Sequence, residues 1–121
     1  MKEIDSKKFY LYIKINNMKI NILKCNTFKT KLLGLSFQKK RINYGIVLVK
    51  CNSIHTFFMR QPIDICITDK NNKILYLQEN FKPNKILFIR DGYYTYELPI
   101  DTVKHLKIDE TLKLYEEEFL K

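Results

Sequence analysis

The chain has 121 residues, a length that suits one domain over residues 1–121, and 45% of them are hydrophobic, which is enough for a buried core. The formal net charge of +9 could attract nucleic acid or anionic lipid, but the basic residues are scattered and all except Arg41, Arg60 and Arg90 are lysine. We therefore favour a solvated lysine-rich surface over a nucleic-acid-binding one, and the odd count of three cysteines argues against a disulfide scaffold.

The N-terminal part of the chain predicts a hairpin and a short helix. Residues 9–15 alternate apolar and polar side chains, Asn16-Asn17 suits a tight turn, and residues 18–25 return as a second strand. Asn26 or Thr27 can cap a helix that runs through Leu33. Residues 1–15 contain no apolar run long enough for a signal peptide or a bilayer span, so we expect a cytoplasmic protein without a membrane span.

The middle of the chain predicts three strands. Residues 44–49 are continuously apolar, which indicates a strand covered on both faces. Residues 54–58 and 63–68 are strand candidates, and Pro62 lies in the connection between them because proline lacks a backbone donor. In the second of these strands, side chains alternate between the two faces, which places three isoleucines on one face. They are Ile63, Ile65 and Ile67, and the residues between them are Asp64, Cys66 and Thr68.

The two strand candidates at 54–58 and 63–68 are expected to pair as an antiparallel hairpin whose tip is formed by Met59, Arg60 and Gln61. This register puts His55 on the same side as Asp64 and within diagonal reach of it. Thr56 is expected to face the core and to bond its hydroxyl to backbone. The Asp64 carboxylate needs a partner, for which His55, Arg60 and a backbone amide are the candidates.

The C-terminal part predicts further short strands. Residues 69–72 form a turn, and a strand follows at 73–77, with an extension toward Phe81. Residues 86–89 and 93–98 are expected to form a hairpin, because Asp91-Gly92 is a strong turn signal. A short helix starts at Asp101 or Thr102, and a last strand spans 111–115. Alternation and frequent turns together predict a mainly β fold with seven or eight strands, an antiparallel sandwich or barrel with one or two short helices.

Six segments, taken together and in this order, resemble the family called domain of unknown function 192 over about residues 27–114. They are Leu33-Gly34-Leu35-Ser36, Gly45-Ile46-Val47-Leu48-Val49, Ser53-Ile54-His55-Thr56-Phe57-Phe58-Met59, Pro62-Ile63-Asp64, Ile65-Cys66-Ile67-Thr68-Asp69 and Tyr96-Glu97-Leu98-Pro99. The resemblance implies a small jelly-roll-like β domain with short helices at its edge. It implies no established activity.

The sequence departs from the family pattern in three places. Ser36 stands where the family has methionine, Ile100-Asp101 replaces a small residue and a glycine, and Asp109-Glu110 replaces a late Gly-Asp turn. A residue other than glycine has an energetic cost at positive φ. The loops at Ile100-Asp101 and at Asp109-Glu110 are therefore expected to differ in conformation from those of the family.

Three classes of function fit these residues. The first, which we favour, is a non-catalytic module that binds a small molecule or a protein near the central stretch. Its candidate ligand-binding residues are His55, Thr56, Met59, Arg60 and Asp64. The second is a hydrolase-type enzyme that uses His55 with Asp64, although no nucleophile stands at motif spacing. The third is a basic nucleic-acid-binding domain. We expect no cofactor and no metal, because Cys51, His55 and Cys66 lack the paired spacing of a closed zinc site.

Overall fold

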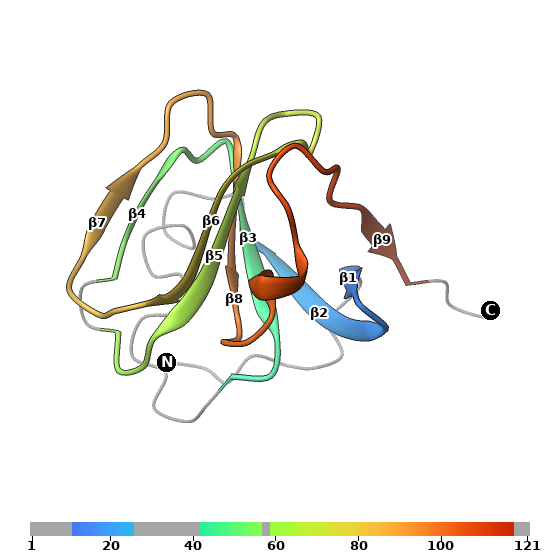
Figure 1. Ribbon diagram of the computed structural model, residues 1–121, viewed down its shortest axis with the longest axis horizontal. Coiled ribbons are helices and arrows are strands. Elements are labelled where there is room, and N and C mark those ends of the chain that lie inside the picture. Colours follow the sequence, from blue (N-terminus) through green and yellow to red (C-terminus); the bar gives the residue numbers. More distant parts are fainter. Residues whose placement is uncertain (1–10, 26–41, 57–58, 118–121) are drawn as a thin grey trace.

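The computed structural model of the protein describes residues 11–25, 42–56 and 59–117. They form a seven-stranded sheet with the order β6-β5-β8-β3-β2-β1-β9 and a two-stranded sheet of β4 and β7 (Figure 1). The elements are β1 (Leu11–Ile15), β2 (Met18–Cys25), β3 (Gly45–Val49), β4 (Ser53–His55), β5 (Ile63–Thr68), β6 (Ile74–Phe81), β7 (Ile86–Phe88), β8 (Tyr94–Leu98), the 3-10 turn η2 (Val103–His105) and β9 (Leu114–Glu116).

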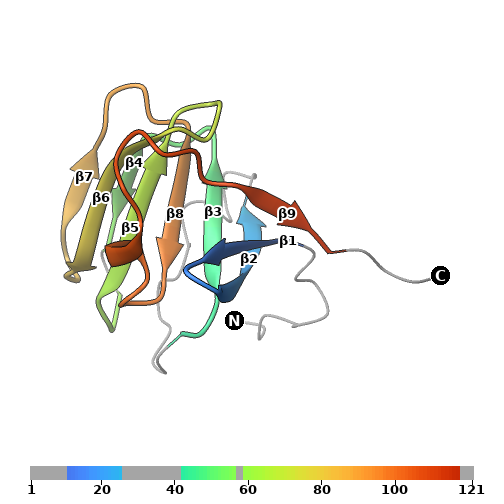
Figure 2. The same cartoon turned by 45° about the vertical axis from the view of Figure 1, so that its right-hand side comes forward.

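Each face of the large sheet carries its own hydrophobic cluster. Along β5, Cys66 belongs to one cluster and the three isoleucines belong to the other, as the period-two alternation of a strand requires. The first cluster includes Val103 and Leu112 from the C-terminal segment, and the second includes Ile54 from β4. The segment around η2 therefore covers one face of the large sheet, and the β4–β7 sheet covers the other (Figure 2).

The prediction of a mainly β protein is confirmed, with two refinements. Nine strands lie in the described residues instead of seven or eight, and β2 pairs in parallel with β3, so the large sheet is mixed. The short helix expected after Thr102 is a single 3-10 turn. The helix expected between residues 26 and 33 lies outside the described residues.

The central hairpin predicted for residues 54–68 is wrong. β4 pairs with β7, whereas β5 pairs with β6 on one side and with β8 on the other. Every residue of β5 is buried, so this strand needs two neighbours and two covered faces, while Ser53 on β4 is exposed. β4 and β5 therefore lie in different sheets and do not pair with each other.

The hairpin predicted for residues 86–98 is also wrong, although its turn is present. Asp91 has φ 67°, and the Gly92 N–H donates to the Ile89 carbonyl over 3.1 Å. The turn connects the two sheets instead of joining paired strands, because β8 pairs with β3 and β5. A Cβ atom at Gly92 would lie 2.9 Å from Ile67 Cγ2, so the close approach of the two layers favours glycine here.

The two loops that depart from the family pattern adopt left-handed backbone conformations without glycine. Asp101 has φ 69° and Asp109 has φ 75°. Aspartate tolerates this region better than most residues, because its short side chain can bond to nearby backbone. The replacement of glycine therefore does not prevent a left-handed conformation at these two positions.

Substitution of Gly45 by alanine is expected to lower the free energy of unfolding by about 1–3 kcal/mol. A Cβ atom there would lie 2.7 Å from Leu98 Cδ2, 2.9 Å from Ile22 Cδ1 and 3.0 Å from the Glu97 carbonyl oxygen. Urea unfolding measures the loss, and the double variant Gly45→Ala with Leu98→Val should recover part of it. An unchanged unfolding midpoint for Gly45→Ala would show that β3 can move away from its neighbours at no cost.

Candidate functional site

Asp64, a candidate from the sequence, is a fully buried carboxylate that holds three segments of backbone together. Its Oδ1 accepts from the Asn80 N–H over 2.9 Å. Its Oδ2 accepts from the Thr102 N–H over 3.0 Å and from the Val103 N–H over 3.1 Å. The expectation that Asp64 has a partner is confirmed, and among the three candidates the partners are backbone amides. The carboxylate fixes the end of β6 and the start of η2 against β5.

Thr56 serves the same purpose for the turn between β6 and β7. Its hydroxyl donates to the Lys82 carbonyl over 2.8 Å and accepts from the Lys85 N–H, also over 2.8 Å. Its side chain is buried, so the expectation that Thr56 faces the core and bonds to backbone is confirmed. Thr56 therefore anchors the 82–85 turn to the end of β4.

The remaining central candidates do not gather around Asp64. His55 lies opposite Ile86 in the β4–β7 sheet, which covers the face of β5 opposite to that of Asp64, so the predicted placement of the two on one side is wrong. Met59 is buried in the cluster of isoleucines, and Arg60 is exposed. A ligand-binding role for these five residues stays a prediction, while the described contacts give Thr56, Met59 and Asp64 tasks within the scaffold.

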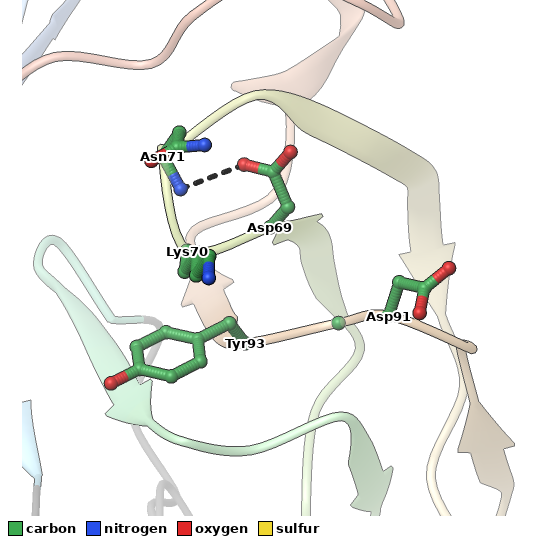
Figure 3. A pocket seen from close by; sticks show the side chains of 6 residues that line it. Asp69, Lys70, Asn71, Asp91 and Tyr93 are labelled. Carbon is green, nitrogen blue, oxygen red and sulfur yellow. Dashed lines mark hydrogen bonds between the residues drawn. The ribbon is translucent and has the colours of Figure 1, made fainter.

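A hollow of about 250 Å³ lies at one end of the large sheet, between two turns (Figure 3). The β5–β8 register produces it, because Thr68 pairs with Tyr94 and the turns that adjoin these two residues must then meet. The hollow is lined by Asp69, Lys70 and Asn71 from the β5–β6 turn and by Asp91, Gly92 and Tyr93 from the β7–β8 turn. Its lining residues carry carboxylate, ammonium, amide and phenol groups.

The β5–β6 turn is rigidly held. Asp69 Oδ1 accepts from the N–H groups of Asn71 and Lys73 over 2.8 and 3.0 Å, the first of which is drawn in Figure 3. Asn72 has φ 63°, and its side-chain Oδ1 accepts from the Tyr96 hydroxyl over 2.9 Å. Side chain and backbone together thus fix this wall of the hollow.

The β7–β8 turn is tied to two other segments. The Tyr93 N–H donates to the Thr68 carbonyl over 2.8 Å, and the Cys51 N–H donates to the Tyr93 carbonyl over 2.8 Å. The Thr95 hydroxyl in turn donates to the Cys51 carbonyl over 2.9 Å. The second wall of the hollow is therefore also held by hydrogen bonds.

Both turns are recognisable in the sequence, but the hollow between them is not. The Asp-Lys-Asn-Asn and Asp-Gly signals mark the turns one by one, and nothing in either indicates that they are neighbours. No local pattern joins them, because the continuous burial of residues 63–68, which calls for a neighbouring strand on each side, becomes visible only in the structure.

The buried thiols have no feature of a reactive site. Burial raises the pKa of the Cys66 thiol from its ordinary value of 9.0 to about 12. Burial, and secondarily the charge of Glu97, raises the pKa of the Cys25 thiol to about 11. In the described residues, no group of three or more histidine, cysteine or acidic side chains is placed to hold a metal ion. Within the same ranges, no helix is long and apolar enough to cross a membrane.

These raised pKa values predict a loss of stability at alkaline pH. The unfolded thiols ionise near pH 9, while Cys66 and Cys25 stay protonated in the folded protein up to about 12 and 11. Stability is therefore full below pH 9 and falls as the pH rises toward these values, because the unfolded state then binds fewer protons. Urea unfolding between pH 8 and 10.5 measures this, and Cys66→Ala should give a shallower slope than the wild type. Identical slopes would contradict the assignment.

Comparison with known proteins finds one family and two solved structures. The profile of the family DUF192, described as "Uncharacterized ACR", matches residues 11–114. A crystal structure of a proposed transcription regulator from Sinorhizobium meliloti 1021 is 16% identical, with a TM-score of 0.71, over 88% of this chain and 91% of that one. A protein of unknown function from Novosphingobium aromaticivorans is 13% identical, with a TM-score of 0.70, over 88% and 83% of the two chains.

At these identities the two structures show a shared fold. No curated protein matches the chain. The family profile covers most of the sequence, including β5 with Asp64 and both turns that line the hollow. The chain therefore belongs to the DUF192 family.

Proposed function

We propose that this protein is a non-catalytic binding domain that holds a small polar molecule in the hollow between the β5–β6 and β7–β8 turns. The main observation behind this proposal is that hydrogen bonds hold the backbone of both turns, while two of the side chains that line the hollow are available to a ligand. The backbone of both turns is fixed by hydrogen bonds. The side chains of Lys70 and Asp91 make no hydrogen bond or ion pair with any residue in the described part of the chain. Preorganised walls lower the entropic cost of binding.

The lining residues indicate the chemistry of the ligand. The Lys70 ammonium donates hydrogen bonds, and the Asp91 carboxylate accepts them. The half-buried Tyr93 offers a ring face and a hydroxyl. The volume of about 250 Å³ lies just below the range of roughly 300–1,000 Å³ for drug-sized ligands. A compact molecule that carries both donors and acceptors fits these groups.

The non-catalytic part of the proposal is supported by the central residues. Both Asp64 oxygens accept backbone N–H groups, and His55 belongs to the layer on the opposite face of β5. A hydrolase-type pair of His55 with Asp64 would need the two side chains within hydrogen-bond reach. Nucleic-acid binding stays the third alternative, with net charge and the description of one structural neighbour in its favour.

A thermal-shift screen of amino acids, sugars, nucleotides and small carboxylic acids tests the proposal. A ligand that binds the native state raises stability by mass action, by about 2.7 kcal/mol at 100 times its Kd. We expect at least one compound to stabilise the wild type, and the Lys70→Ala and Asp91→Asn variants to lose that response.

The matched controls are Lys104→Ala and Asp109→Asn, which alter an exposed lysine and an exposed aspartate outside the hollow and should respond like the wild type. Equal responses in all five proteins would place the ligand elsewhere. The absence of any stabilising compound would count against a small-molecule function.

A further inference from the structure

β7 is an open edge of the outer layer. Within the described residues it pairs with β4 alone, and both views place it at the margin of the molecule (Figures 1 and 2). The Ile89 N–H donates to the Asn52 carbonyl, and the Lys85 carbonyl accepts from the Thr56 N–H. Backbone groups alternate in direction along an antiparallel strand, so those of Ile86 and Phe88 point away from β4. This edge can hydrogen-bond to another strand.

The side chains on this edge are unusually apolar for an exposed position. Ile86 is 70% exposed and Phe88 is 63% exposed, whereas Leu87 between them packs against the isoleucine cluster. His55 and Ser53 lie directly opposite these two residues and share their face. Natural sheets protect open edges with charged residues, proline or a covering segment. β7 contains no charged residue and no proline. Exposed apolar side chains on an open edge are typical of a site for strand addition.

The charge around β7 indicates the partner. Lys82, Lys85 and Arg90 flank the strand and are exposed, and the first acidic residue after it, Asp91, lies beyond Arg90 in the turn to β8. Two copies of this edge paired with each other would bring like charges together, which is unfavourable. We propose that β7 binds an extended acidic segment of another protein as an added strand. Its apolar side chains pack on Ile86 and Phe88, and its acidic residues face the flanking cations.

Selection of random 12-residue peptides displayed on phage against the full chain tests this inference. We expect enriched peptides to carry two apolar residues separated by one position and flanked by aspartate or glutamate. Their synthetic counterparts should bind with an affinity that falls as salt is raised, because the flanking ion pairs are exposed and screened.

Two variants separate the apolar part of this surface from the charged part. The double variant Ile86→Ser with Phe88→Ser, and the double variant Lys85→Glu with Arg90→Glu, should each weaken peptide binding at least tenfold. The matched controls are Ile108→Ser, at a residue that is 50% exposed, and Lys104→Glu, and both should bind like the wild type. Unchanged thermal unfolding verifies that each variant is folded.

Several outcomes would overturn the inference. Enriched peptides without an excess of acidic residues would contradict the assigned partner. Binding that survives both double variants would contradict the assigned surface. A dimer in sedimentation experiments that Ile86→Ser with Phe88→Ser abolishes would assign β7 to a second copy of the chain. Binding to vesicles of anionic phospholipid that the same variant abolishes would assign it to a membrane surface. A selection that enriches nothing would also contradict it.

Discussion

Replacement of Asp64 by asparagine is expected to lower the free energy of unfolding by about 2–4 kcal/mol. The Asp64 carboxylate is fully buried and accepts three backbone N–H groups, one at Oδ1 and two at Oδ2. An asparagine side chain has one acceptor oxygen, so its amide group must face at least one of these donors. The variant also loses the negative charge that strengthens each hydrogen bond.

Urea unfolding of the wild type and of Asp64→Asn measures this loss. Asp109→Asn is the matched control, because the Asp109 side chain is 73% exposed in its contact with Lys73, and we expect it to change stability by no more than about 0.5 kcal/mol. The response to any ligand of the hollow should survive in Asp64→Asn below its unfolding transition. A stable Asp64→Asn variant that has lost ligand binding would mean that Asp64 belongs to a site and not to the scaffold.

Replacement of Thr56 by valine is expected to lower the free energy of unfolding by about 2–3 kcal/mol. Valine keeps the shape of threonine but removes the hydroxyl. The Lys82 carbonyl would then lose a donor at 2.8 Å, and the Lys85 N–H would lose an acceptor at 2.8 Å. These two bonds hold the β6–β7 turn together with the backbone bonds that Thr56 makes to Asn84 and Lys85.

Thr56→Ser is the matched control, since serine keeps the hydroxyl and loses one methyl group, which costs about 1 kcal/mol. Hydrogen exchange adds a local measurement. The amides of Lys85 and Ile89 should exchange faster in Thr56→Val than in Thr56→Ser. If valine proves less harmful than serine, packing of the methyl group and not the hydroxyl holds the turn.

The sequence predicted those features that depend on neighbouring residues. The strand at 63–68 has the bounds of β5, its isoleucines share one face, and the turns at 69–72 and 91–92 are present. Alternation and turn chemistry are local properties, so a single sequence reveals them. The strand partners were predicted wrongly, because pairing depends on contacts between distant segments such as β4 with β7. A short connection between two strands suggested a hairpin in both incorrect cases.

The same division applies to the candidate site. The need of a buried carboxylate and a buried hydroxyl for partners follows from elementary chemistry, and the backbone partners of Asp64 and Thr56 agree with it. The hollow depends on Thr68 lying beside Tyr94, which is a pairing across 26 positions of the chain. No local pattern encodes that pairing.

The location of ligand binding tests the account most directly. Backbone amide chemical shifts of ¹⁵N-labelled protein would be followed during titration with the compound that gives the largest thermal shift. We expect the amides of Lys70, Asn71, Gly92 and Tyr93 to move, and those of Thr56 and Asp64 to stay unchanged. Shifts centred on residues 55–64, with the two turns unaffected, would contradict the account and return the site to the central stretch.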